Sequence, residues 1–154
     1  MTNYLPSWIT VLAALLTPTI AAIVAVIAWL QYKTARAKLK FDLFEKRFAI
    51  HNCIATCLAE TATHGNANDE LLRTYLVGTR DSPFLFDTEF FDYTRTVYNK
   101  LVRLNFLESQ ISGAEGELRT RLVNERETVF DWLTKEMMNL QTKMMPYLSF
   151  SNIR

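Results

Sequence analysis

The chain opens with an uninterrupted apolar stretch. Trp8 to Leu30 is a run of 23 residues without a charged side chain, WITVLAALLTPTIAAIVAVIAWL. As a helix rising about 1.5 Å per residue, it is roughly 34 Å long, enough to cross a hydrocarbon core of about 30 Å. Trp8 and Trp29 stand at its two ends, where interfacial aromatic residues are expected. The run is too long for a cleaved signal peptide and lacks a basic segment before it, so the pattern predicts a transmembrane helix.

Small residues recur within this stretch at alternating spacings of four and three. This alanine seam consists of Ala14, Pro18, Ala21, Ala25 and Ala28. Small side chains on one face allow helices to approach closely in a bilayer, so the alanine seam predicts association of several copies. Pro18 removes a backbone hydrogen bond in mid-span and predicts a kink. A simple anchor with an incidental proline is the alternative.

The helical pattern continues beyond the span, because no Gly or Pro interrupts the chain from Tyr32 to Thr63. A heptad seam, spaced as in packed helices, runs along this segment. Its members are Ala37, Phe41, Phe44, Phe48, His51, Ala55 and Leu58. A turn is expected over 64–68, with Asn68 or Asp69 capping a short helix from Asp69 to Val77 that stops at Gly78. Residues 78–87 form an apolar loop in this prediction.

Two longer helices are expected next, separated by a break at 112–116 that contains two glycines. Asp87 or Thr88 caps the first helix, and the second runs from Glu117 to Met145 and ends at Pro146. The apolar faces consist of Phe90, Val97, Leu101, Leu104 and Ile111 in the first helix, and of Leu118, Leu122, Val129, Trp132, Leu133, Leu140 and Met144 in the second. The predicted fold is all-α: a transmembrane segment over 1–32 that continues into a small cytosolic helical bundle over 33–154.

Charge is distributed unevenly along the chain. Residues 1–32 carry none, residues 33–47 carry six basic and two acidic side chains, and residues 48–154 carry 11 basic and 14 acidic. The basic collar directly after the span predicts a cytosolic bundle and an outward N-terminus in a bacterial inner membrane. Anionic lipid is sufficient to explain the collar. A net charge of +1 gives no support for binding of DNA or RNA polymers.

Residues suited to catalysis are sparse. The sequence has no phosphate-cradling glycine loop, nucleophile elbow or paired-histidine metalloprotease motif. His51, Cys53, Cys57 and His64 form the one group whose spacing allows a zinc site. A buried cytosolic cysteine is more often a small apolar residue. No enzyme activity, catalytic residue, metal or cofactor is therefore predicted.

An aromatic cluster and its neighbouring cations are the candidate ligand-binding features. The aromatic residues are Phe84, Phe86, Phe90, Phe91, Tyr93 and Tyr98. They are either core residues or a stacking surface for a base or a partner, with Arg80 or Arg95 beside it. Lys100 and Arg103 lie three apart on one helix face and are positioned to contact phosphates at an oligomer mouth. Arg80, Lys100 and Arg103 are the predicted ligand-binding residues.

Three motifs carry a resemblance: KLKFDLFEKRFAIH over 38–51, GTRDSPFLFDTEF over 78–90, and PYLSF over 146–150. Through them nearly the whole chain resembles small bacterial single-span membrane proteins of unassigned role. In size, span and topology it is also similar to a small membrane effector of type III CRISPR defence. That resemblance implies a cytosolic tetramer that binds cyclic tetra-adenylate and perturbs the membrane. It supplies no binding residues, because no ligand motif matches position by position.

Two functional hypotheses follow. The first is an oligomeric membrane effector, with a tetramer favoured, whose cytosolic bundle senses a small nucleotide messenger and perturbs the membrane or opens a pore. The second is a constitutively anchored assembly subunit that binds a cytosolic protein partner through its aromatic face.

Overall fold

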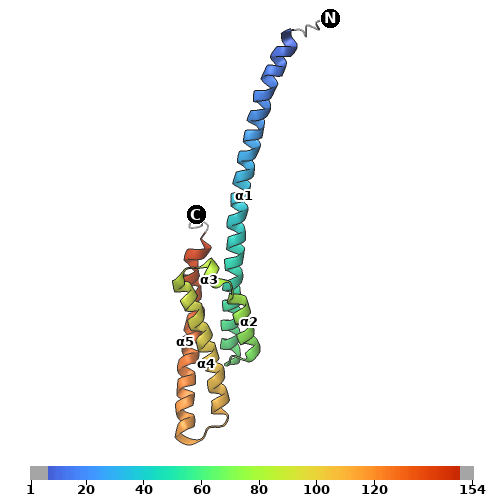
Figure 1. The fold of residues 1–154 in the computed structure, drawn as a ribbon. Coiled ribbons are helices and arrows are strands. Elements are labelled where there is room, and N and C mark those ends of the chain that lie inside the picture. The colour runs from blue at the N-terminus through green and yellow to red at the C-terminus, as the bar shows by residue number, and fades with distance from the viewer. Residues whose placement is uncertain (1–6, 150–154) are drawn as a thin grey trace. The chain divides into compact units, whose positions relative to one another are not determined.

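The computed structural model describes residues 7–149, which form five helices and contain no strand (Figure 1). The helices are α1 (Ser7–His64), α2 (Asp69–Thr79), α3 (Ser82–Leu85), α4 (Thr88–Ile111) and α5 (Gly116–Leu148). The chain divides into two compact units, Met1–Phe41 (unit 1) and Asp42–Arg154 (unit 2). Among the described residues the all-α prediction is confirmed. Phe150, at the end of the third motif, lies outside them.

Unit 1 contributes the N-terminal part of α1, which continues through Pro18 as one helix. The helix is long and apolar enough to cross a membrane, with a mean hydropathy of 1.9 over its most apolar window. All five residues of the alanine seam are exposed to solvent in the single chain. The Thr19 hydroxyl donates to the Leu15 carbonyl at 2.7 Å, so it does not serve the Ala14 carbonyl that Pro18 leaves without its helical donor. The kink at Pro18 stays a prediction.

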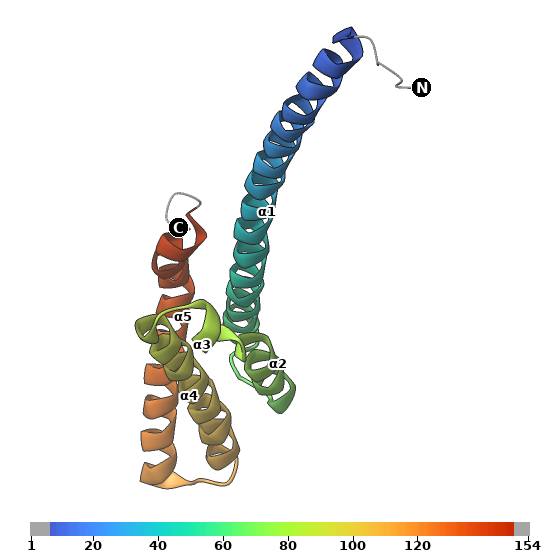
Figure 2. The same ribbon diagram turned by 45° about the horizontal axis from the view of Figure 1, so that its top comes forward.

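The helices of unit 2 begin where short polar side chains cap them. Asn68 caps α2 by accepting a hydrogen bond from the Leu71 N–H at 2.8 Å. Asp87 caps α4 in the same way, through the Phe90 N–H at 2.9 Å. Each cap satisfies a backbone donor that the first helical turn leaves unpaired. Both capping residues were among those predicted from the sequence. Figures 1 and 2 show that α4 and α5 are antiparallel neighbours joined by the 112–115 turn.

One apolar core joins four helices of unit 2. Ile54, Leu58, Leu101, Leu104, Leu133, Leu140 and Met144 are among its fully buried members. On α1 the buried face carries Ile50, Ile54, Cys57 and Leu58, roughly a quarter turn from most of the predicted heptad seam. Burial through that seam was therefore wrong for most of its members in unit 2, because the other helices of this unit pack against the neighbouring face.

Four further predictions need correction. Gly78 lies inside α2, which continues to Thr79, and the expected loop contains the single-turn helix α3 with Pro83 in its first turn. Pro146 lies inside α5, since only two residues of the helix follow it and the hydrogen bond that it removes is near the end. Leu118 belongs to the predicted apolar face of α5, but its side chain is exposed.

Arg47 connects three elements of unit 2. Its Nε donates to the Leu85 carbonyl of α3 at 2.9 Å, and its Nη1 donates to the Tyr147 carbonyl of α5 at 3.1 Å. The guanidinium also lies 5.7 Å from the ring centre of Phe86 and 5.9 Å from that of Tyr147. This residue of the basic collar is therefore used within the bundle and not left for lipid.

Candidate functional site

A cleft between α2 and α4 combines two arginines with aromatic rings. Its volume is about 220 Å³. We call it the arginine cleft, and its principal residues are Tyr75, Arg80, Phe91, Arg95, Tyr98 and Asn99. Arg80 follows the end of α2, whereas Phe91, Arg95 and Tyr98 are spaced four and three apart on α4 and so share one helix face.

The two guanidinium groups of the arginine cleft are weakly engaged. Arg80 pairs with the adjacent Asp81 at 3.3 Å, but both side chains are largely exposed, at 79% and 63%. Exposed pairs of this kind contribute little energy, so Asp81 does not hold Arg80 firmly. Arg95 lies over the Phe91 ring, 5.8 Å from its centre. Both groups can therefore turn toward an anion at modest cost.

Tyr75 forms the rigid floor of the cleft. It is buried, its hydroxyl donates to the Thr94 carbonyl at 3.0 Å, and its ring is stacked with that of Tyr98 at 6.1 Å between ring centres. Burial raises the pKa of Tyr75 well above its ordinary value, so the phenol is neutral at physiological pH. A neutral aromatic floor with two cations at the rim suits a ligand that has both an anionic group and a flat ring.

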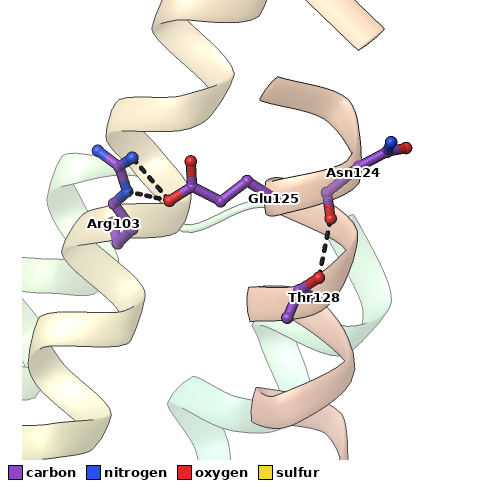
Figure 3. A network of polar contacts seen from close by, with 4 residues as sticks. All are labelled: Arg103, Asn124, Glu125 and Thr128. Carbon is purple, nitrogen blue, oxygen red and sulfur yellow. Dashed lines mark hydrogen bonds and ion pairs between the residues drawn. The ribbon is translucent and has the colours of Figure 1, made fainter. Parts of the chain in front are cut away.

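Lys100 and Arg103 lie elsewhere, on the side of α4 that faces α5. Figure 3 shows that Arg103 donates through Nε and a terminal nitrogen to one Glu125 oxygen, at 2.9 and 2.7 Å. Beyond Glu125, the Thr128 hydroxyl donates to the Asn124 carbonyl at 2.9 Å. Lys100 lies 5.7 Å from the ring centre of Trp132. Of the three predicted ligand-binding residues, only Arg80 lines the arginine cleft.

The aromatic cluster predicted from the sequence divides into two groups and one exposed residue, Phe84. Phe86 and Phe90 pack with Tyr93 and Tyr147 in unit 2, with ring centres 4.3 to 5.6 Å apart in the contacting pairs. Phe91 and Tyr98 instead line the arginine cleft. Tyr75 and Asn99 were missed as cleft residues because the contact between α2 and α4 joins segments distant in sequence. The common face of Phe91, Arg95 and Tyr98 was the local signal that was available.

The cysteines occur in a packed contact. Cys53 and Cys57 are both free, and the Cys53 thiol donates to the Thr74 carbonyl of α2 at 3.6 Å. A hydrogen bond from the Cys57 thiol lowers the pKa of Cys53 to about 7 and raises that of Cys57. Within residues 7–149, no three His, Cys, Asp or Glu side chains gather in a way that could hold a metal ion.

A second concavity lies between α1 and α5 and is mainly apolar. This groove has a volume of about 550 Å³. Its lining includes Phe48, His51 and Ala55 of the heptad seam together with Met137, Leu140 and Met144 of α5. Phe48 stacks with Phe44 on one side and His51 on the other, with ring centres 5.8 Å apart in both pairs. These three residues of the heptad seam, which are not fully buried, thus form one wall of the groove.

Comparisons of the chain with protein-family models, curated proteins and solved structures found no match. The functional argument therefore depends on the residues of this chain.

Proposed function

We propose that the protein is a single-pass membrane effector whose cytosolic unit 2 binds a soluble anionic ligand in the arginine cleft. The observation that carries this proposal is the cleft itself, where Arg80 and Arg95 flank a floor formed by Tyr75. Cations beside the half-buried rings of Phe91 and Tyr98 can bind phosphate and a nucleobase together. A nucleotide messenger is the ligand class whose chemistry these residues suit, and the sequence resemblance makes a cyclic oligoadenylate the first one to test.

The proposed output depends on α1. This helix carries the candidate span and also contributes Ile50, Ile54 and Leu58 to the core of unit 2. Ligand binding that favours one packing of the core is then transmitted to the membrane segment, because no flexible linker separates the two parts. Several copies, four in the favoured arrangement, associate through the alanine seam in a bacterial inner membrane. The rearrangement perturbs the membrane or opens a pore.

Calorimetric titration of the full chain in detergent micelles tests the binding step. The panel contains cyclic tetra-adenylate, cyclic hexa-adenylate, ATP and inorganic phosphate. We expect one nucleotide to bind, and R80Q/R95Q to weaken its affinity by at least about tenfold, because two charged hydrogen-bond donors are lost. The matched control R119Q/R121Q removes two exposed arginines of α5 and should change affinity by less than about twofold.

A third variant tests whether the ligand binds at the arginine cleft or at Lys100 and Arg103, the other two residues predicted from the sequence. K100Q/R103Q removes the cations that face α5 and leaves the arginine cleft intact. A loss of affinity in this variant alone would move the site to the α4–α5 side. No binding by any panel member to a chain confirmed to be folded would contradict the nucleotide proposal.

The second candidate function is a constitutive assembly subunit, and the apolar groove between α1 and α5 favours it. Grooves of this kind accept an amphipathic helix from a partner. A photo-crosslinking amino acid at position 48, inside the groove, should then yield one discrete adduct with a cytosolic protein in cells. The same group at position 84, on an exposed side chain outside the groove, is the control. Absence of an adduct specific to position 48 would count against this function.

A further inference from the structure

The part of α1 that follows the apolar stretch carries a shallow hollow bordered by aromatic and basic side chains. The hollow has a volume of about 490 Å³ and lies entirely within unit 1. Its principal residues, which we call the lipid hollow, are Trp29, Tyr32, Lys33, Arg36 and Lys40. Trp29 and Tyr32 are exposed, at 55% and 62%.

These side chains occupy one face of the helix. The positions 29, 33, 36 and 40 are spaced four, three and four apart, which keeps them within one stripe of an α-helix. The Lys33 ammonium lies 4.0 Å from the centre of the Trp29 ring, a cation–π contact that holds it beside the indole. Lys38 is on the opposite face, half a turn from the stripe.

The charge of the lipid hollow is uncompensated along the chain. The first acidic residue of the sequence is Asp42, so no carboxylate precedes or interrupts the stripe. An indole at the end of an apolar helix takes the level of the lipid headgroups, and cations one to three turns later reach the phosphate layer. Three cations on one face thus meet a headgroup from the same side.

We propose that the lipid hollow binds the headgroup of an anionic phospholipid, with Arg36 and Lys40 contacting its phosphate, and with Trp29 and the adjacent Lys33 packing against the glycerol part of the lipid. The site rests on the membrane-crossing part of the proposed function and is independent of the arginine cleft. This site differs from non-specific attraction of anionic lipid to the whole basic collar, because only the cations on one face of α1 bind the lipid. Lys38 belongs to the same basic collar but takes no part in binding the lipid.

The full chain in neutral detergent micelles is titrated with phosphatidylglycerol and, separately, with phosphatidylcholine, and bound lipid is counted by native mass spectrometry. We expect one phosphatidylglycerol per chain to bind at least about tenfold more tightly than phosphatidylcholine. K40Q should weaken phosphatidylglycerol binding about fivefold, and R36Q/K40Q more than about tenfold. The matched control K38Q, two residues away on the opposite face, should change it less than about twofold.

Equal losses in K38Q and K40Q would overturn the proposal, because they would show attraction without a preferred face. So would equal affinity for the two lipids, or displacement of phosphatidylglycerol by an equal concentration of soluble glycerol 3-phosphate. A separate readout tests the span: the full chain should stay with cell membranes after an alkaline carbonate wash. Release by the wash would refute the membrane-crossing part of the proposed function, whatever the lipid titration shows.

Discussion

Gly78 of α2 packs closely against Cys53 of α1. Gly78 is the last residue but one of α2, where alanine is the better helix former by less than the roughly 1 kcal/mol of a helix interior. A methyl group at position 78 would collide with the Cys53 Sγ and lie only 3.0 Å from the Cys53 Cβ. The absence of a side chain therefore serves packing, and it allows the Cys53 thiol to reach the Thr74 carbonyl.

Gly78→Ala should lower the free energy of unfolding by about 1–3 kcal/mol, despite the better helix propensity of alanine, because overpacking moves the two helices apart. Thermal unfolding of the full chain in micelles, followed by circular dichroism, measures the change. Gly113→Ala is the matched control, since no atom lies within 4 Å of the added carbon, and it should be neutral. Cys53→Ala in the Gly78→Ala background should recover part of the loss. A stabilised single variant would refute the close contact.

At the scale of elements, Arg47 holds the end of α3 and the end of α5 against α1. The Leu85 carbonyl lies at the end of α3, and the Tyr147 carbonyl belongs to the last turn of α5. Helix ends leave carbonyl groups without intrahelical donors, and a guanidinium can serve two of them at once. The Tyr147 hydroxyl also donates to Asp87 at 2.6 Å, and this hydrogen bond lowers the pKa of the Asp87 carboxyl.

Arg47→Gln should reduce the free energy of unfolding by about 2 kcal/mol, because two partly buried carbonyls lose a charged donor. The adjacent exposed Lys46 supplies the control: Lys46→Gln removes the same charge and should change stability by less than about 0.5 kcal/mol. Chemical unfolding of the full chain in micelles compares the two variants. Equal effects would mean that Arg47 acts through general charge alone.

How far sequence predicts the elements depends on whether the deciding interaction is local. Asn68 and Asp87 were identifiable as caps because each side chain bonds within its own first turn. Gly78 was mistaken for a helix stop, because the glycine is explained by its close contact with Cys53 of another helix. The heptad seam was read correctly as apolar but assigned to the wrong role, since spacing defines a face and not the partner that covers it. The arginine cleft is formed only where α2 packs against α4, and the sequence does not show this contact. Arg80 was therefore predicted as a ligand-binding residue, whereas Asn99 was missed.

At the scale of the whole molecule, the proposed function predicts more than one copy, associated through the exposed alanine seam. The double variant A21L/A25L adds bulk to the seam, and we expect it to raise the dissociation constant of the oligomer at least about tenfold. I23L/V26L, on the opposite face, should leave it within about twofold. Analytical ultracentrifugation of the full chain in density-matched detergent measures both. A monomeric wild-type chain under these conditions would contradict the oligomer.

The core of unit 2 joins segments far apart in the sequence, from Ile50 in α1 to Met144 in α5, and this has a consequence for biogenesis. The apolar face of α1 leaves the ribosome long before α5 exists to cover it. At a synthesis rate of about 5–20 residues per second, that face waits roughly 5 to 20 s for its partner. We therefore expect chaperones and proteases to have access to this segment in a newly made copy until α5 has been synthesised.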